Sequence, residues 1–362
     1  PKGKNQKSMK DLVPSEIAEY ASEDADVTFQ LKTLFEKQFQ EENIKNLLYG
    51  IEMPVSSVLM SMECEGITLD TVALSKFSIE LSSSLEKLHE GIIEDAGTEF
   101  NVDSPKQLGD ILFNVLQIDE KAKTTKTGQF KTDEATLSKL KNKHEIIGKI
   151  LNYRQQKKLK STYVDALPKL ANPTTNKIHT TYLQTVASTG RLSSNNPNLQ
   201  NIPIRSEMGR EIRKAFIPRG QEYKIFAADY SQIELRIIAA LSGDENMKKA
   251  FISGEDIHAA TAAKVFNVSL EEVDRDMRSK AKAVNFGIIY GVSAFGLAQN
   301  LNIPRREAKE IIESYFEQYP KIKTFMDQSI ELAKEKGFIE TIMHRKRYLK
   351  DINSTNGIVR GH

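Results

Sequence analysis

The sequence has few of the residues that cross-link a chain or gather around a metal ion. Its single cysteine, Cys64, excludes an internal disulfide and a cysteine-cluster metal site. Its six histidines are scattered and show no paired spacing of the zinc-binding kind. No apolar run approaches the roughly 18 residues that a membrane span requires, and no signal peptide precedes the first predicted helix. We therefore expect a soluble protein of a reducing intracellular compartment, with no membrane partner.

The sequence also lacks a strong charge of one sign. Its 51 lysines and arginines nearly balance its 49 aspartates and glutamates, which gives a formal net charge of +2. This balance excludes a uniformly basic coat for nucleic acid, so any nucleic-acid surface must come from local segregation of charge. Basic clusters do occur in residues 121–132 and 153–163. Each suits contact with a charged polymer, and each equally suits simple solvation.

The length of 362 residues exceeds one ordinary core, so we expect two or three domains or subdomains. The chain begins with Pro1 rather than methionine, and we expect a piece of a longer protein. Apolar residues recur at helical spacing through most of the sequence, and runs of β-branched or aromatic residues predict strands in a smaller part. The expected helices cover residues 14–40, 51–66, 71–96, 133–170 and 246–318, and the expected strands cover residues 177–186, 213–217 and 223–228, with a hairpin in 337–349.

Four residues at a strict spacing of four form the most informative pattern: Arg278, Lys282, Phe286 and Tyr290. On a helix they make one slowly winding stripe roughly 18 Å long, with two cations at its start and two aromatic rings at its end. A triphosphate can lie along the cations while a sugar and a base rest against the rings. The alternative is an amphipathic helix that packs its aromatic residues on a core and leaves its basic end in water.

Three polar stretches bear on this choice. Asp229 follows the predicted strand 223–228, and a carboxylate there can hold a divalent cation or simply cap the next helix. The amide-rich loop 187–206 suits the acceptor-rich minor groove of a duplex, or it is a polar surface loop. In Y-A-S-E-D, Tyr20 and Asp24 lie one helical turn apart. They can orient a metal-bound water, or they are a half-buried tyrosine beside a surface carboxylate.

Four longer motifs follow one another along the chain. They are T-G-R-L-S-S (189–194), P-N-L-Q-N-I-P (197–203), D-Y-S-Q-I-E-L-R (229–236) and R-x-x-x-K-x-x-x-F-G-x-x-Y-G (278–291). In order and spacing they resemble a family A DNA polymerase of the bacterial DNA polymerase I type. The resemblance covers essentially the whole chain, because Y-A-S-E-D resembles the last motif of a proofreading exonuclease and F-N-V-D-S-P-K-Q-L (100–108) resembles the start of a thumb.

The resemblance implies an α+β fold with the right-hand architecture of a polymerase. Helical thumb and fingers would flank an antiparallel-sheet palm that is incomplete at the C-terminus. The implied divisions are an exonuclease remnant in 1–46, a first palm segment in 47–75, a thumb in 76–170, a palm in 171–255, fingers in 256–345 and the start of the returning palm in 346–362. The resemblance also implies a monomer in the bacterial cytoplasm or in an organelle of bacterial descent.

The resemblance assigns catalysis and metal binding to a few residues. Asp229 and the backbone carbonyl of Tyr230 would hold metal, and Asp229 and Lys282 would be catalytic. Lys282 would donate a proton to the leaving pyrophosphate. Glu234 would select deoxyribose by excluding a 2′-hydroxyl group. Phe286, in place of tyrosine, implies discrimination against dideoxynucleotides.

Further residues match contacts to nucleotide and DNA. Tyr290 matches the ring that stacks at the templating site when the fingers are open, and His258 matches a phosphate-contacting histidine. The implied nucleotide-binding set is Gln232, Glu234, His258, Arg278, Lys282, Phe286 and Tyr290. The implied DNA-binding set is Arg191, Asn198, Gln200, Asn201 and Arg205. Tyr20 and Asp24 match the exonuclease remnant.

The implied reaction is attack by a primer 3′-hydroxyl on the α-phosphate of a deoxynucleoside triphosphate, directed by a template, in DNA replication or repair. Two Mg²⁺ ions, with Mn²⁺ as a substitute, would be the cofactors, and primer-template DNA and deoxynucleoside triphosphates the partners. One family motif is absent, the His-Asp-Glu hairpin that supplies the second metal-bridging carboxylate. We therefore expect the 362-residue piece to bind DNA weakly and to incorporate no nucleotide alone.

Two other functions stay open at this point. One is a noncatalytic nucleic-acid-binding relative of a polymerase, although such a scaffold has no need of intact Asp229, Lys282 and Tyr290. The other is a single-subunit RNA polymerase. It is disfavoured by Glu234 and Phe286, because an enzyme that uses ribose needs space or a hydroxyl group at those positions.

Overall fold

The computed structural model describes residues 9–39, 42–204, 206–301 and 303–360. The chain divides into two compact units, Pro1–Phe226 and Ala227–His362. Both units are largely helical and carry small antiparallel sheets, as the predicted α+β class requires. In the parts of the chain that the structure describes, no helix combines the length and apolarity needed to cross a membrane.

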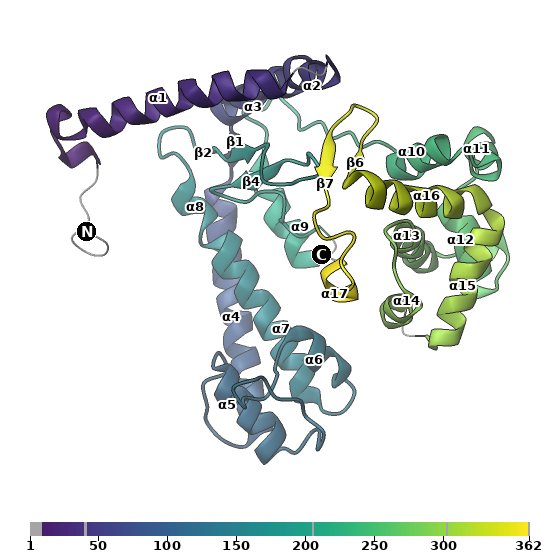
Figure 1. Cartoon of the computed structure of the whole chain (residues 1–362). Coiled ribbons are helices and arrows are strands. Elements are labelled where there is room, and N and C mark those ends of the chain that lie inside the picture. The colour runs from purple at the N-terminus through teal and green to yellow at the C-terminus, as the bar shows by residue number, and fades with distance from the viewer. Residues whose placement is uncertain (1–8, 40–41, 205, 302, 361–362) are drawn as a thin grey trace. The chain divides into compact units, whose positions relative to one another are not determined.

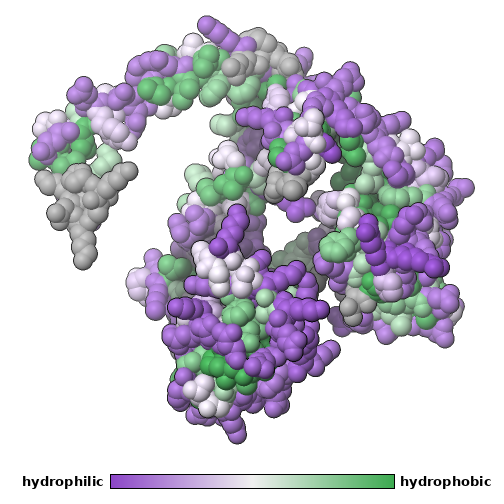
Figure 2. Space-filling model, turned by 60° about the horizontal axis from the view of Figure 1, so that its bottom comes forward, coloured by the Kyte–Doolittle hydropathy of each residue, from purple (hydrophilic) through white to green (hydrophobic). Residues whose placement is uncertain are grey.

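The first unit begins with a long helix, α1 (Pro14–Gln38), which follows a short turn, η1 (Met9–Asp11). Next come α2 (Glu42–Leu47), a π-helical turn η2 (Leu48–Glu52) and α3 (Met53–Glu65). Figure 2 shows hydrophobic side chains along the surface of α1. Five of these exposed residues are Val27, Phe29, Leu31, Leu34 and Phe35.

A three-stranded antiparallel sheet lies at the centre of the first unit. Its middle strand is β1 (Ile67–Leu69), flanked by β2 (Lys177–Ile178) and β5 (Phe216–Ile217). A second antiparallel sheet has two strands, β3 (Thr181–Leu183) and β4 (Ser193–Asn195). Two residues of the sheet, Leu69 and Ile178, are buried, and they share a core with the buried residues Leu74 and Leu81 of the helix that follows β1.

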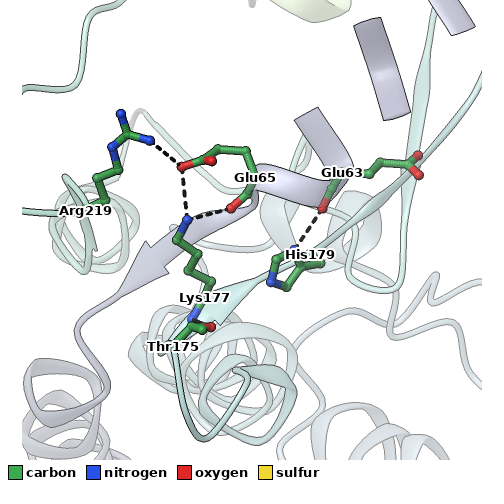
Figure 3. A network of polar contacts seen from close by, with 6 residues as sticks. All are labelled: Glu63, Glu65, Thr175, Lys177, His179 and Arg219. Carbon is green, nitrogen blue, oxygen red and sulfur yellow. Dashed lines mark hydrogen bonds and ion pairs between the residues drawn. The ribbon is translucent and has the colours of Figure 1, made fainter. Parts of the chain in front are cut away.

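The turn from α3 into β1 depends on Gly66. Its φ of 63° is left-handed, and a Cβ there would lie 2.7 Å from the ring of His179 and from the carbonyl oxygen of Ile178. The adjacent Glu65 accepts hydrogen bonds from Lys177 Nζ at 3.0 Å and from Arg219 at 3.1 Å (Figure 3). These contacts tie the end of α3 to strand β2 and to the segment that follows β5.

Two long helices extend from this sheet, side by side (Figure 1): α4 (Thr71–Ala96) and α7 (Glu145–Leu159). Asp70 caps α4 by accepting from the backbone N–H of Ala73 at 2.8 Å, and Gly97 ends it in the left-handed conformation. The chain between α4 and α7 forms α5 (Pro105–Asp110), η3 (Ile111–Val115) and α6 (Glu134–Lys139). After α7 come η4 (Lys160–Val164), α8 (Leu167–Leu170) and α9 (Glu207–Lys214).

The second unit is a helical body around one core. Its elements are α10 (Ile233–Ser242), α11 (Glu245–Ile252), α12 (Ile257–Phe266), η5 (Leu270–Glu272), α13 (Arg275–Ile289), α14 (Ala294–Leu301), α15 (Arg305–Gln318), α16 (Pro320–Lys336), the hairpin β6 (Phe338–Glu340) and β7 (Lys346–Tyr348), and α17 (Gly357–Arg360). Leu235, Met247, Val284 and Ile322 are fully buried in the core that these helices share. Helix α13 therefore has one face buried in this core and an opposite face that is exposed and can carry functional side chains.

The predicted helices and the hairpin are confirmed, with 133–170 broken into several pieces. Three strand predictions are wrong in whole or in part. The run 177–186 splits between β2 and β3 in different sheets. Of 213–217, Arg213 and Lys214 end α9, whose N-cap Ser206 and amphipathic face favour a helix, while Phe216 and Ile217 form β5 as predicted. Residues 223–228 form no strand, because no described strand pairs with them. The loop 187–206 includes the short strand β4, which the sequence does not predict.

Candidate functional site

Helix α13 carries the predicted stripe on its outer face. Asp274 caps the helix by accepting from the backbone N–H of Met277 at 2.8 Å. Arg278 and Phe286 are partly exposed and Lys282 is exposed. The opposite, buried face consists of Ala281, Val284, Asn285 and Ile288. The packing of this second face fixes the direction in which the stripe points.

The aromatic end of the stripe is a continuous stack. The rings of Phe286 and Tyr290 lie 6.3 Å apart, with an angle of 19° between their planes. Lys282 Nζ lies 5.8 Å from the centre of the Phe286 ring, within reach of a cation–π contact. The side chains of Lys282, Phe286 and Tyr290 therefore follow one another along the helix, as the spacing predicts.

The first cation of the stripe is paired with the start of a neighbouring helix. Arg278 Nε donates to Asp256 Oδ2 at 2.5 Å. The other oxygen of Asp256 caps α12 by accepting from the backbone N–H groups of His258 and Ala259 at 3.0 and 3.2 Å. Burial raises the pKa of Asp256, but the bonds from Arg278 and from these amides outweigh burial and leave the pKa below its usual value. The carboxylate thus holds Arg278 beside α12.

His258, predicted to contact phosphate, is almost entirely buried. Its ring packs against Phe286 at a centroid distance of 5.8 Å. Burial, followed by the positive charge of Arg278, lowers the pKa of His258 to about 4, against an opposing effect of Asp256. The ring is therefore neutral near pH 7. Its Nε2 atom is buried and has no hydrogen-bond partner among the described residues.

Helix α10 brings the predicted sugar-selecting carboxylate to the aromatic end of the stripe. The hydroxyl of Tyr290 donates to Glu234 Oε1 at 2.9 Å. Glu234 lies in the first turn of α10, which buried Leu235 anchors in the core. Gln232 caps that helix in a left-handed conformation, and its Oε1 is buried without a hydrogen-bond partner in the described residues. Two residues predicted from separate motifs are thus in direct contact.

Asp229 and Tyr230 lie in a different setting from the predicted one. The prediction placed Asp229 at the end of a buried strand, but residues 223–230 have no regular structure and are exposed. Phe226 is 89% exposed and Tyr230 is 80% exposed. The strand prediction failed because an apolar run becomes a strand only when a neighbour satisfies its backbone groups.

The described residues do not gather a complete metal site. Nowhere in residues 9–39, 42–204, 206–301 and 303–360 do three or more His, Cys, Asp or Glu side chains cluster so that they could hold an ion. Asp229 and the carbonyl of Tyr230 are oxygen donors of the type that Mg²⁺ prefers. One carboxylate and one carbonyl do not by themselves fit a pair of ions.

The first unit holds a groove of about 790 Å³ between α7 and the loop before α9, lined by both apolar and polar residues. Arg154 and Lys158 line it from the helix, and the predicted DNA-binding residues Asn198 and Asn201 line it from the loop. The hydroxyl of Tyr163 donates to the backbone oxygen of Asn201 at 2.7 Å and so fixes the loop to the helical pair. Two cations and two amides are therefore presented together.

The remaining predicted DNA-binding residues lie nearby in the chain. Gln200 is exposed, and its backbone N–H donates to the side-chain oxygen of Asn198 at 3.1 Å. Arg191 is exposed in the segment before β4. Arg205 lies outside the described residues. Tyr20 and Asp24, the predicted exonuclease remnant, are both exposed on α1.

Sequence reasoning missed three residues that the structure joins to the site: Asp256, Thr261 and Asn285. Asp256 stands two residues before His258 in the sequence, and an aspartate at a helix start is a readable cap. Thr261 donates to Asn285 Oδ1 at 2.9 Å. The only sequence signal for Asn285 is an amide on an otherwise apolar helix face.

Comparison with known proteins gives a consistent result. The family model described as DNA polymerase family A matches residues 71–362. DNA polymerase I of Geobacillus stearothermophilus is 48% identical over 356 residues, which cover 98% of this chain and 40% of that protein. DNA polymerase I of Bacillus subtilis is 45% identical over 356 residues, with the same two coverages. The chain thus spans about 40% of the length of these curated relatives.

A solved structure shares the fold. It is described as the POL domain of Pol1 from M. smegmatis in complex with DNA primer-template and dNTP. The similarity has a TM-score of 0.79 and 41% sequence identity, and it covers 87% of this chain and 55% of that one.

Proposed function

The chain belongs to DNA polymerase family A, and we propose that it takes part in template-directed DNA synthesis. In this reaction a primer 3′-hydroxyl attacks the α-phosphate of a deoxynucleoside triphosphate and pyrophosphate leaves. The observation that carries the proposal is the α13 stripe, two cations followed by two stacked rings, with Tyr290 bonded to Glu234. The similar M. smegmatis structure was solved with primer-template and dNTP, which supports the same ligands here.

The cationic end of α13 would receive the triphosphate. Arg278 and Lys282 lie one helical turn apart and present their charges on the same face as the rings. A fixed positive charge beside the leaving pyrophosphate stabilises the charge that develops on it. We assign proton donation to pyrophosphate to Lys282, because an ammonium held against a polyphosphate is a charged donor at the leaving group. Arg278 uses its Nε to bond Asp256, and the other N–H groups of its guanidinium would bind phosphate.

The aromatic end would receive the sugar and base. Phe286 offers a partly exposed ring against which the deoxyribose packs, and the residue has no hydroxyl group that could replace a missing 3′-hydroxyl. Glu234 would exclude a 2′-hydroxyl by occupying its place. The hydrogen bond from Tyr290 holds Glu234 in position at 2.9 Å. Loss of the Tyr290 hydroxyl should therefore weaken selection more than the chemical step.

Primer-template DNA would lie against the groove of the first unit. Arg154 and Lys158 supply phosphate contacts that do not depend on sequence, while Asn198 and Asn201 supply amides for base edges in the minor groove. Arg191, Gln200 and Arg205 extend this proposed DNA-binding set. We further propose that the protein acts as a monomer.

Catalysis by this family implies two Mg²⁺ ions, with Mn²⁺ as a substitute. Asp229 and the carbonyl of Tyr230 would supply ligands, but the described residues contribute no cluster of three or more acidic, histidine or cysteine side chains. A single carboxylate does not fit the pair of ions that the reaction requires. We therefore propose that the 362-residue chain binds DNA weakly and incorporates no nucleotide by itself.

A primer-extension assay tests both halves of the proposal. The 362-residue chain and the full-length polymerase that contains it are compared with the same primer-template, dNTPs and Mg²⁺. We expect template-dependent extension by the full-length protein and none by the chain. Extension by the chain alone would overturn its proposed inactivity. Absence of extension by the full-length protein, with DNA binding retained, would favour a noncatalytic relative.

A further inference from the structure

A chain of polar side chains joins α12 to α13 behind the stripe; Asn285 and His258 are buried in it, and Thr261 is half-buried. Thr261 Oγ1 donates to Asn285 Oδ1 at 2.9 Å, and Asn285 Nδ2 lies 2.9 Å from His258 Nδ1. Asn285 is 0% exposed and His258 is 1% exposed. Water therefore does not compete for the bond between Asn285 and His258, and these two groups are limited to the partners that the protein supplies.

The direction of these hydrogen bonds fixes the proton on the histidine ring. Because the Thr261 hydroxyl donates to the oxygen of the Asn285 amide, the NH₂ end of the amide faces His258. An NH₂ group can only donate, so His258 Nδ1 accepts and carries no proton. A neutral imidazole with a bare Nδ1 has its proton on Nε2. A charged ring would place two donors against each other in a buried site.

The Nε2–H group that results has no partner in the part of the chain that the structure describes, although it is buried. Buried donors are nearly always paired, so an unpaired one within an otherwise satisfied cluster points to a missing ligand. The charged groups that act on the ring from α13 and from the start of α12 are Arg278, Lys282 and Asp256. Two of the three are cations, which makes an anion the ligand that the surroundings favour.

We propose that Thr261 and Asn285 are positioning residues, which hold His258 in its neutral Nε2–H form so that it donates a hydrogen bond to a phosphate oxygen of the bound triphosphate. The identity of the ligand rests on the proposed function, whereas the state of the ring does not. The depressed pKa of His258, about 4, agrees with a neutral ring near pH 7. Arg278 and Lys282 would contribute charge, and His258 would contribute a directed neutral donor.

A purely structural role makes different predictions. A cluster that only joins α12 to α13 would lose stability when a member is changed, with the same ring tautomer and the same affinity for triphosphate. The tautomer and the affinity therefore separate the two roles, and stability alone does not.

The first experiment observes the ring directly. The ligand-free chain is labelled with ¹⁵N-histidine, and its side-chain nitrogen and proton signals are recorded by NMR near pH 7. The His258 signals are assigned by their loss in His258→Gln. We expect one neutral Nε2–H form. An Nδ1–H form, a charged ring or an equal mixture of tautomers would overturn the proposed relay, the hydrogen-bond chain from Thr261 through Asn285 to His258. This measurement requires no catalytic activity.

The second experiment compares Thr261→Val, which removes the hydroxyl at nearly constant volume, with Thr261→Ser, which keeps it. We expect Thr261→Val to populate the second tautomer and to weaken binding of dATP about tenfold, a factor typical of a lost hydrogen bond to a charged group. Thr261→Ser should restore both properties. The matched control is Thr324→Val, because the exposed Thr324 bonds only a backbone oxygen of its own helix, at 3.3 Å.

The outcomes of the dATP titration separate the two proposals. A folded Thr261→Val variant with unchanged tautomer and unchanged dATP affinity would overturn the positioning role. If the unmodified chain binds no dATP, the nucleotide-binding function fails, and the phosphate role of His258 fails with it. The NMR spectra would still show whether Thr261 and Asn285 set the tautomer.

Discussion

The α13 stripe and the segment of residues 223–230 are the two regions that the sequence assigns to the nucleotide site, and they fold in opposite ways. The stripe belongs to a helix with a buried inner face, and its residues contact one another and their neighbours. The segment has no regular structure, and Phe226 and Tyr230 are mostly exposed. The stripe is held by packing within the second unit, whereas residues 223–230 span the division between the two units and have no such packing.

The difference follows from where each element finds its hydrogen bonds. A helix pairs its own backbone groups within a few residues, so α13 needs neighbours only for its buried face. A strand pairs its backbone with another strand, and a short apolar run without one is not stable in water. None of the described strands pairs with residues 223–228. The position of Asp229 is therefore less constrained than that of Lys282.

The largest expected effect tests whether the exposed region is nevertheless essential. In the full-length polymerase, Asp229→Asn should lower the rate of nucleotide incorporation by about 10³-fold or more, because it removes a proposed metal ligand. Single-turnover primer extension measures the rate. Asp327→Asn, which changes an exposed aspartate paired with Lys323, is the matched control. A rate within a few-fold of the unchanged enzyme would show that residues 223–230 are not part of the catalytic site.

The next prediction divides the stripe itself. Lys282→Ala should lower the incorporation rate by about 10²-fold, because a fixed charge beside the leaving group is lost. Tyr290→Ser should change the rate much less and should increase misincorporation, because the ring proposed to stack at the templating site is lost. Rates for correct and incorrect nucleotides measure both effects. Equal losses of rate with no change in fidelity would contradict this division between the cationic and aromatic ends.

How far the sequence predicted these regions depends on how local their causes are. The helix over 71–96 is predicted to the residue, because Asp70 and Gly97 are readable caps around a periodic apolar face. The stripe on α13 is predicted from spacing alone. The strand at 223–228 is not, because its formation depends on a distant partner. In 213–217 the strand at Phe216 and Ile217 was predicted correctly, but Arg213 and Lys214 were misread because the helix that Ser206 begins continues to Lys214.

The candidate site shows the same limit. Arg278, Lys282, Phe286 and Tyr290 were found because they repeat on one helix. The bond from Tyr290 to Glu234 joins residues 56 positions apart, and no pattern within either helix predicts it. The relay from Thr261 to Asn285 was missed for the same reason, since each residue alone is an unremarkable polar group on a helix. The sequence predicted the helices that carry these residues, but it did not predict the contacts between the helices.

A matched pair of truncations should sharpen the contrast in stability. Leu235→Ala removes a fully buried side chain of the second unit's core, and we expect a loss of about 2–5 kcal/mol in the free energy of unfolding. Phe226→Ala removes a side chain that is 89% exposed, so the change should stay within about 0.5 kcal/mol. Urea denaturation followed by circular dichroism measures both. A loss above about 2 kcal/mol for Phe226→Ala would mean that residues 223–230 are packed in solution.

The last prediction uses pH to compare the same two regions. Burial lowers the pKa of folded His258 to about 4, whereas an unfolded histidine titrates near pH 6.5. Below pH 6.5 the unfolded chain therefore binds a proton that the folded chain refuses. The neutral ring therefore contributes its full stabilisation above pH 6.5. As the pH is lowered toward 4, the free energy of unfolding falls by about 3 kcal/mol at most.

Denaturation at pH 7, 5.5 and 4 should show the difference in the free energy of unfolding between the unchanged chain and His258→Gln narrowing by that amount. For the exposed region, the curve of Phe226→Ala should run parallel to that of the unchanged chain. A His258→Gln gap that stays constant with pH would show that the ring is not buried in its neutral form.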